Sequence, residues 1–193
     1  DKKYVNIMYD RVKKIAEAAA MMANVDYDMQ LISGIYEILP NRFGASIIQD
    51  NFKILGEIKY TDSEVNYANT ILRETGKELK GLDGKIKPIK PTLPAQGGST
   101  DVGDVSQVVP VVRLSTTTAA KDGPWHSWAV VACTGMSIGH KGMIYATKAL
   151  AMTMLDLYKN PKLVDGVKKE FLERKGDRVY VPQIPPGPPR LVD

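Results

Sequence analysis

The sequence predicts an α/β fold, because segments with helical periodicity alternate with two segments that have the pattern of strands. The helical segments repeat their apolar residues every three to four positions and begin at recognisable capping residues. The strand-like segments are residues 25–39 and 106–114. The chain has 193 residues, 44% of them hydrophobic and 25% charged, which is typical of a folded globular protein of one domain or of one domain and part of another.

An amphipathic helix is expected at the start of the chain, and we expect its apolar stripe to lie in a core. Residues 25–39 then predict a strand, in which Tyr27, Met29 and Leu31 alternate with polar residues until Pro40 ends it. The stripe of the helix repeats at steps of three and four and consists of Val5, Met8, Val12, Ile15, Ala19 and Met22.

Two helices with clear capping signals follow. Asn41 is expected to cap a helix over residues 42–55. Thr61 and Glu64 have the spacing of a capping box, in which each side chain bonds the backbone N–H of the other, and Gly76 ends the helix that they begin.

The second half of the chain has a long loop, a strand-like run, two helices and a tail. Residues 77–98 carry five lysines, three prolines and a Gly-Gly pair without regular periodicity, which predicts a loop. The β-branched run 106–114 is fit for a buried strand, although Pro110 favours an edge position or a bulge. We predict a long helix from Ser137, another from Pro161 to Gly176, and an extended proline-rich tail.

Charge and cysteine content exclude several classes of protein. The 26 Lys and Arg against 22 Asp and Glu give a net charge of +4, and they are scattered among acidic residues, so we expect no nucleic-acid partner. A single cysteine cannot form an internal disulfide, which favours the cytoplasm. No apolar run reaches the roughly 18 residues that span a bilayer, so no membrane partner is expected. A chain that starts at Asp1 and enters a helix at once is expected to be a fragment.

One short stretch, WHSWAVVACTGMSIGH, residues 125–140, holds both histidines, both tryptophans and the cysteine. His126 lies between the tryptophans after a Gly-Pro turn, a setting that suits either a metal-bound imidazole or a packed histidine. It has no HxH, HxxxH or HxD partner in the sequence. We expect the tryptophans to pack, and Cys133 to be a small buried residue rather than a nucleophile.

Two further motifs carry polar groups beside glycines. GGSTDVGD, residues 97–104, places Asp101 and Asp104 in a glycine-rich turn before the predicted strand, where they either serve a site or bond the local backbone. SIGHKGM, residues 137–143, places His140 and Lys141 at the start of a helix, where they either help to hold an anion or face water.

Taken together, these motifs resemble a known family. The stretches GGSTDVGDVSQVVP, HSW and GMSIGHKGM, in this order and followed by a helix, resemble the C-terminal part of the metal-dependent amidohydrolase/peptidase family that includes carboxypeptidase G and the aminoacylases. The likeness is greatest to its aminobenzoyl-glutamate utilization branch. RVKKIAEAAAMM and the segment ending in YEILPN are similar to the close of that family's inserted lid or dimerisation domain, so the resemblance covers essentially the whole chain.

The resemblance implies a domain organisation and an activity. Residues 1–39 would be the last helix and strand of the lid or dimerisation domain, and residues 40–193 the C-terminal half of a phosphorylase/hydrolase-like α/β metallopeptidase catalytic domain. The implied enzyme hydrolyses the amide bond of a small-molecule substrate, an acyl- or aroyl-amino acid such as aminobenzoyl-glutamate. Two divalent ions, zinc or manganese, would activate the attacking water. A homodimer is implied for the intact enzyme.

The resemblance also assigns roles to individual residues. His126 matches the family's last metal-ligand histidine. The family's HxD ligands and general-base glutamate lie in its N-terminal half and have no match here, so no catalytic residue is assigned and the chain is expected to be inactive alone. Gln107 and Val108 stand where this branch is expected to have an aromatic residue, which leaves the substrate open. The remaining candidates are Asp101, Asp104 and Ser99 for the active-site loop or a position behind the metal ligands, and His140, Lys141 and Asn41 for substrate binding.

A second hypothesis needs no catalysis. The basic loop from Lys77 to Lys90 and the proline-rich tail would bind a partner, and the chain would be a non-catalytic interaction module.

Overall fold

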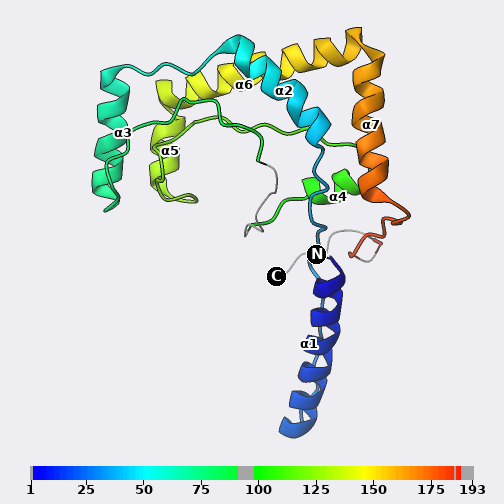
Figure 1. Cartoon of the computed structure of the whole chain (residues 1–193). Coiled ribbons are helices and arrows are strands. Elements are labelled where there is room, and N and C mark those ends of the chain that lie inside the picture. Colours follow the sequence, from blue (N-terminus) through cyan, green and yellow to red (C-terminus); the bar gives the residue numbers. More distant parts are fainter. Residues whose placement is uncertain (1, 91–97, 185, 188–193) are drawn as a thin grey trace. The chain divides into compact units, whose positions relative to one another are not determined.

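The computed structural model describes residues 2–90, 98–184 and 186–187 (Figure 1). The chain divides into two compact units that are described separately. The first unit consists of Asp1–Pro40, Pro94–Val111 and Phe171–Asp193, and the second of Asn41–Leu93 and Val112–Glu170.

Regular structure in the described residues is helical, and no strand is assigned among them. The α/β class therefore stays a prediction, as does the assignment of residues 1–39 and 40–193 to two domains. The helices are α1 (Lys2–Ala23), α2 (Arg42–Leu55), α3 (Asp62–Glu74), α4 (Val102–Val108), α5 (Trp128–Thr134), α6 (Ser137–Lys159) and α7 (Pro161–Lys175).

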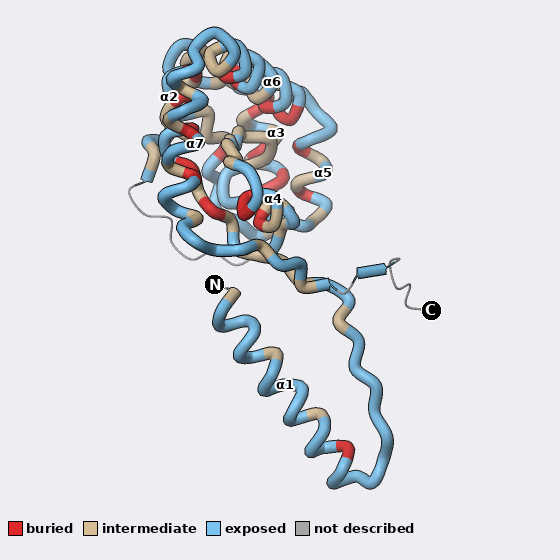
Figure 2. Tube along the Cα trace, turned by 90° about the vertical axis from the view of Figure 1, so that its right-hand side faces the viewer, coloured by how far each residue is buried: buried red, intermediate tan, exposed pale blue. Residues whose placement is uncertain are grey.

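Helix α1 forms where its periodicity predicts, but its apolar stripe is not in a core. Figure 2 shows the helix exposed along most of its length, and Ala20 is its one buried residue. Ile15 is 67% exposed and Met22 is 89% exposed. The expected core position was wrong because a helix buries its stripe only where a second element packs on it, and the described residues supply none along this face.

The predicted strand at residues 25–39 is irregular chain in the structure. Near its end, its backbone bonds side chains of α4 instead of another strand. The N–H of Tyr36 donates to Asp104 at 3.2 Å, and the N–H of Leu39 donates to the hydroxyl of Ser106 at 2.8 Å. The amide of Gln107 donates to the carbonyl of Glu37 at 2.8 Å. These side chains satisfy backbone groups that a ladder would otherwise pair.

The second predicted strand, residues 106–114, was wrong in its first part, because Ser106 to Val108 lie in α4. The helix begins with bonds from the N–H groups of Gly103 and Asp104 to the carbonyls of the two residues three positions earlier. A Cβ at Gly103 would clash with the backbone carbonyl of Tyr36, so the glycine permits this close approach. The turn motif therefore starts a helix rather than a strand.

In the second unit, α2 packs along α6. The cap predicted at Asn41 is confirmed, since its side-chain oxygen accepts from the N–H of Gly44 at 2.7 Å. Farther along α2, the buried amide of Asn51 donates to Thr153 at 3.1 Å and to Asp156 at 2.8 Å, both on α6. Ile47 and Ile48 of α2 are buried as well.

A second group of helices in this unit is α3, α5 and α6. The capping box of Thr61 and Glu64 at the start of α3 is confirmed. A core of Ile71, Ala129 and Cys133 joins α3 to α5, and Cys133 is fully buried as predicted. Helix α5 was not predicted, because only its cap at Ser127 is a local signal and the helix has 7 residues.

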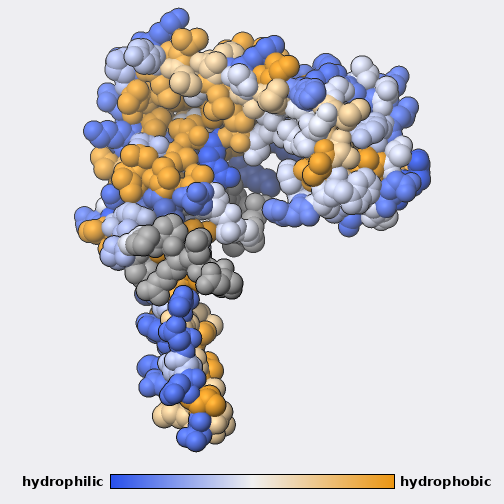
Figure 3. All heavy atoms as spheres, turned by 180° about the vertical axis from the view of Figure 1, so that it is seen from behind, coloured by the Kyte–Doolittle hydropathy of each residue, from blue (hydrophilic) through white to orange (hydrophobic). Residues whose placement is uncertain are grey.

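Helices α6 and α7 begin where the sequence predicts, at Ser137 and Pro161. Gly176 follows α7 with φ of 54°, a left-handed conformation that suits glycine at a helix end. Helix α6 also has an exposed apolar face besides the one that packs on α2 and α5. Apolar side chains gather on the surface seen in Figure 3, and those of α6 that are exposed are Met143, Ile144, Leu150, Met154, Leu155 and Tyr158.

The hairpin of α5 and α6 depends on a glycine. A Cβ at Gly139 would overlap backbone atoms of Thr134, whereas a Cβ at Gly135 would lie 3.5 Å from its nearest neighbour, the carbonyl of Val131. We therefore expect Gly139→Ala to lower the free energy of unfolding by about 1–3 kcal/mol. Gly135→Ala is the matched control and is expected to change it by less than about 1 kcal/mol. Urea unfolding followed by circular dichroism measures both, and equal values would contradict this packing.

Candidate functional site

His126 lies on the turn that precedes α5, in the second unit. Its φ of 56° is left-handed, a conformation that non-glycine residues rarely adopt. The turn is tied locally, because the hydroxyl of Ser127 donates to the carbonyl of Pro124 at 2.6 Å and accepts from the N–H of Ala129 at 3.3 Å. The imidazole is exposed, and within the described part of the chain it makes no hydrogen bond or ion pair.

The tryptophans beside His126 are exposed as well. Trp125 is 70% exposed and Trp128 is 54% exposed, so the expectation that they pack in a core was wrong. Both flank a turn at the start of a short helix, and the core residues of α5 are Ala129 and Cys133 on its other side. The surface around His126 is consequently apolar but open.

The described residues do not form a metal site by themselves. Residues 2–90, 98–184 and 186–187 contain no group of three or more His, Cys, Asp or Glu side chains placed to hold an ion. His126 fits the chemistry of one ligand, since its ring nitrogens are exposed and unbonded. A closed or catalytic site needs at least two more protein ligands, so we derive no reaction step through a metal from these residues.

Asp104, Asp101 and Ser99 belong to the first unit. Asp104 has a structural use, because its carboxylate accepts from the N–H of Tyr36 at 3.2 Å and from the hydroxyl of Tyr180 at 3.0 Å. Asp101 precedes α4 without a side-chain capping bond and is exposed. Ser99 is also exposed, in irregular chain before this helix.

His140 and Lys141 differ although they are neighbours on α6. The side chain of His140 is exposed, and its backbone N–H donates to the carbonyl of Met136 in the first turn of the helix. The ammonium of Lys141 lies 2.6 Å from Glu64 and 3.0 Å from the carbonyl of Lys59, and 5.6 Å from the ring centre of Tyr60. The substrate-binding role predicted for Lys141 stays a prediction, and the structure gives its charge a partner within the chain.

Glu64, the partner of Lys141, accepts several hydrogen bonds. The sequence indicated this residue only as part of a capping box. Besides Lys141, it accepts from the hydroxyl of Ser137 at 2.7 Å and from the N–H of Thr61 at 2.7 Å. Glu64 is 8% exposed. The hydrogen bond from Lys141, followed by those from Thr61 and Ser137, lowers the pKa of Glu64 to about 2 against the opposing effect of burial.

Asn41 also has a structural use in the second unit. Besides capping α2, its buried amide donates to the carbonyl of Val167 on α7 at 2.8 Å. One side chain thus bonds a free N–H group at the start of α2 and a carbonyl group of α7.

Two lysines of the basic loop, Lys80 and Lys87, form ion pairs with acidic side chains. Lys80 lies 3.0 Å from Asp122, and Asp83 lies 3.2 Å from Lys87 and 3.6 Å from Lys121. Residues 91–97 of this loop and most of the proline-rich tail lie outside the described residues. The hypothesis of an interaction module therefore stays a prediction.

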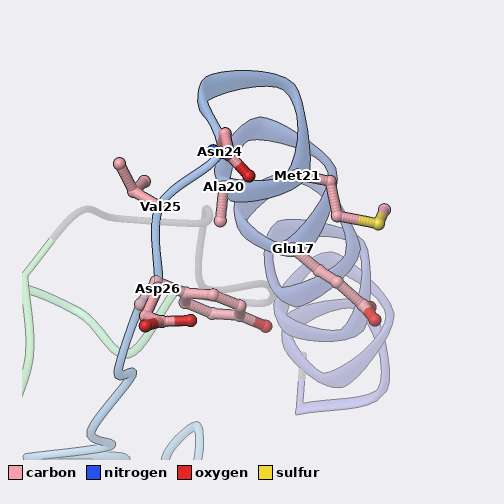
Figure 4. Close-up of a pocket in the computed structure, with 7 residues that line it drawn as sticks. Glu17, Ala20, Met21, Asn24, Val25 and Asp26 are labelled. Atoms are coloured by element: carbon pink, nitrogen blue, oxygen red, sulfur yellow. The ribbon is translucent and has the colours of Figure 1, made fainter.

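Two hollows among the described residues are candidates for a binding site. The first is an open depression of about 670 Å³ at the end of α1, where Glu17, Met21 and Asp26 surround Ala20 (Figure 4). The second is a cleft of about 290 Å³ in the second unit, and its lining combines apolar and charged side chains such as Phe52, Tyr145 and Asp83. Neither contains a histidine, so neither is the setting of the predicted metal ligand.

The chain is similar to two known hydrolases. It is 28% identical over 206 residues to a subunit of the p-aminobenzoyl-glutamate hydrolase of Escherichia coli (strain K12), a match that covers 94% of this chain and 43% of that protein. It is 25% identical over 170 residues to the Xaa-Arg dipeptidase of Mus musculus, which covers 88% of this chain and 33% of that protein. The chain thus spans less than half the length of either relative.

Two other comparisons found no match, either to a family model or to a solved structure. Among the described residues, no helix has the length and apolar character needed to cross a membrane.

We expect Asn41→Ala to lower the free energy of unfolding by about 2 kcal/mol, because it removes a helix cap and leaves the buried carbonyl of Val167 without this donor. Asn41→Ser retains a capping hydroxyl and is expected to cost about half as much. Asn160→Ala, at an exposed bond to the N–H of Lys162, is the control and is expected to cost less than about 1 kcal/mol. Urea unfolding decides, and equal effects of Asn41→Ala and Asn160→Ala would contradict the double role.

The depressed pKa of Glu64 makes the stability of the fold depend on acid. Because the folded-state pKa of about 2 lies below the ordinary value of 4.5, ionised Glu64 stabilises the fold fully above about pH 4.5, and this contribution is lost as the pH falls toward 2. In Glu64→Gln this part of the decline is expected to vanish. Urea unfolding at intervals between pH 2 and pH 6 tests it, and parallel curves for both proteins would show that Glu64 is not the group responsible.

Proposed function

We propose that this chain is the C-terminal portion of a metal-dependent amidohydrolase that cleaves the amide bond of an acyl- or aroyl-amino acid, such as aminobenzoyl-glutamate. Similarity to part of a p-aminobenzoyl-glutamate hydrolase and to a dipeptidase supports it, because both names describe hydrolysis of an amide bond next to an amino acid. The two matches cover 94% and 88% of the chain, so the likeness is not confined to one motif.

The single structural observation that carries the proposal is the state of His126. Its imidazole is exposed and unbonded in the described residues, on a turn held in a left-handed conformation by bonds of the adjacent Ser127. A histidine that served only packing would be expected in the core or with a hydrogen-bond partner. Here the turn is tied by local hydrogen bonds and the ring is exposed, so a ring nitrogen is accessible to an ion.

We propose that His126 supplies one ligand to a site of two divalent ions, zinc or manganese. Such ions activate a water molecule and stabilise the charge that develops on the attacked carbonyl. The described residues contain no group of three or more ligand side chains, so we propose that the site is completed from a region that the relatives have and this chain does not span. What the chain itself contributes is the placement of one imidazole.

The remaining candidates divide by what the structure already uses them for. Asp101, Ser99 and His140 are exposed, so their side chains are accessible for the roles proposed for them. Asp104, Lys141 and Asn41 are bonded within the chain, so a substrate role for them would have to coexist with or replace those bonds. We therefore rank His140 first among the residues to be tested for substrate binding, and Asp101 and Ser99 first among those to be tested for a role in the active-site loop.

We expect the purified 193-residue chain, supplied with zinc or manganese, not to hydrolyse aminobenzoyl-glutamate, because its described residues lack a complete ligand set. A longer polypeptide that includes the missing region of the relatives is expected to hydrolyse it. In that polypeptide His126→Ala should remove one of the two bound ions, measured by elemental analysis, and leave the circular dichroism spectrum unchanged.

The matched control is His140→Ala, which removes the other histidine of the chain and should leave both ions bound. Two ions retained in His126→Ala would overturn the ligand assignment. Turnover by the 193-residue chain alone would overturn the proposal that the site is completed from elsewhere.

A further inference from the structure

Glu64 lies where the first turns of α3 and α6 meet, and it is bonded to both. Within α3 it completes the capping box with Thr61. Across to α6, one carboxylate oxygen accepts from Ser137 at 2.7 Å and the other accepts from Lys141 at 2.6 Å. We call Glu64, Ser137 and Lys141 the clamp.

The clamp also holds α5, because α5 and α6 form a tight hairpin. Gly139 of α6 is so close to Thr134 that a Cβ would overlap its backbone, and two residues separate the helices. On its other side α5 packs against α3 through Ala129 and Cys133, and the hydroxyl of Tyr67 donates to the carbonyl of Ala132 at 3.3 Å. Helix α5 therefore lies between α3 and α6, the two helices that the clamp joins.

His126 is two residues before the first residue of α5, and its turn is bonded to that helix through Ser127. The direction of α5 consequently sets the direction in which the imidazole is presented. A rotation of the hairpin away from α3 would move His126 with it.

We propose that Glu64 is a positioning residue for His126, which acts by clamping the α5–α6 hairpin onto α3. The role of His126 as a metal ligand rests on the proposed function, whereas the clamping of the hairpin does not. In this arrangement Lys141 of the SIGHKGM motif serves chiefly to hold Glu64, and its neighbour His140 is the residue of that motif that faces solvent. The clamp relies on charge, because a neutral amide at position 64 cannot accept from both Lys141 and Ser137 with the same two oxygens.

Cys133 gives a direct measurement of hairpin opening. It is the single cysteine of the chain, it is 0% exposed, and it lies in the contact between α3 and α5. Its thiol should react with 5,5′-dithiobis(2-nitrobenzoate) only when α5 separates from α3 or when the whole chain unfolds. The labelling rate under native conditions therefore reports both routes.

The matched control is Asn51→Ala, which breaks buried bonds between α2 and α6 without touching the clamp. Its partner Thr153 is sixteen residues from Ser137 along α6, about 24 Å at the rise of an α-helix. At urea concentrations that give the two variants equal global stability, Glu64→Gln is expected to label Cys133 at least tenfold faster than Asn51→Ala. Equal rates would overturn the clamp, because global unfolding would then explain all the labelling.

The link to His126 is tested separately by nuclear magnetic resonance. With two histidines in the chain, the imidazole signals are assigned with His140→Asn. We expect the His126 signals to shift or broaden in Glu64→Gln and to stay unchanged in Asn51→Ala. Unchanged signals in Glu64→Gln would overturn the positioning role.

If Glu64→Gln does not fold, Ser137→Ala removes one hydroxyl of the clamp and is expected to accelerate labelling relative to the same control by a smaller factor, about threefold. No acceleration in Ser137→Ala would count against the clamp. Neither measurement uses metal or substrate, so failure of the clamp and failure of the proposed hydrolase activity are separate outcomes.

Discussion

The ionised carboxylate of Glu64 stands at the N-terminal ends of two helices, and the arrangement of the α3, α5 and α6 group depends on it. The N-terminal end of a helix carries a partial positive charge and unsatisfied N–H groups, so one buried anion stabilises both ends. Lys141 brings a cation to the same end of α6, a position that is unfavourable for a cation alone. Its ion pair with Glu64 compensates for this unfavourable position. The same contacts lower the pKa of Glu64.

Buried ion pairs are often weak sources of net stability, because the cost of removing two charges from water offsets their attraction. Here the cost is reduced on one side, since Lys141 is 36% exposed, while Glu64 is surrounded by donors. The pair is therefore better understood as a device that selects one arrangement of the helices than as a large stabilising term. Apolar contacts such as those of Ile71 and Cys133 would tolerate small rotations of α5, whereas the hydrogen bonds of Glu64 would not.

The sequence predicted those features whose causes are local. Asn41, the Thr61–Glu64 box and the Pro161 start are capping signals, and each helix begins where its signal stands. Helix α5 has one capping residue and too few turns for a periodic pattern, so it was missed. The strand patterns of residues 25–39 and 106–114 could not be resolved in the same way, because a strand needs a partner that is distant in the sequence. In the described residues those partners are absent, and side chains of α4 bond part of the first segment instead.

The candidate site shows the same division between local and distant causes. The resemblance predicts that His126 is a metal ligand, and the structure adds that its turn is tied by local hydrogen bonds while its ring is exposed. The sequence could not predict that Lys141 pairs with Glu64. The two residues are 77 positions apart, and no motif contains both. A resemblance transfers the identity of a residue but not the contacts that orient it. In this chain the orientation of the one candidate ligand is set through α5 by a residue on α3, so the proposed chemistry of His126 depends on an ion pair that does not touch it.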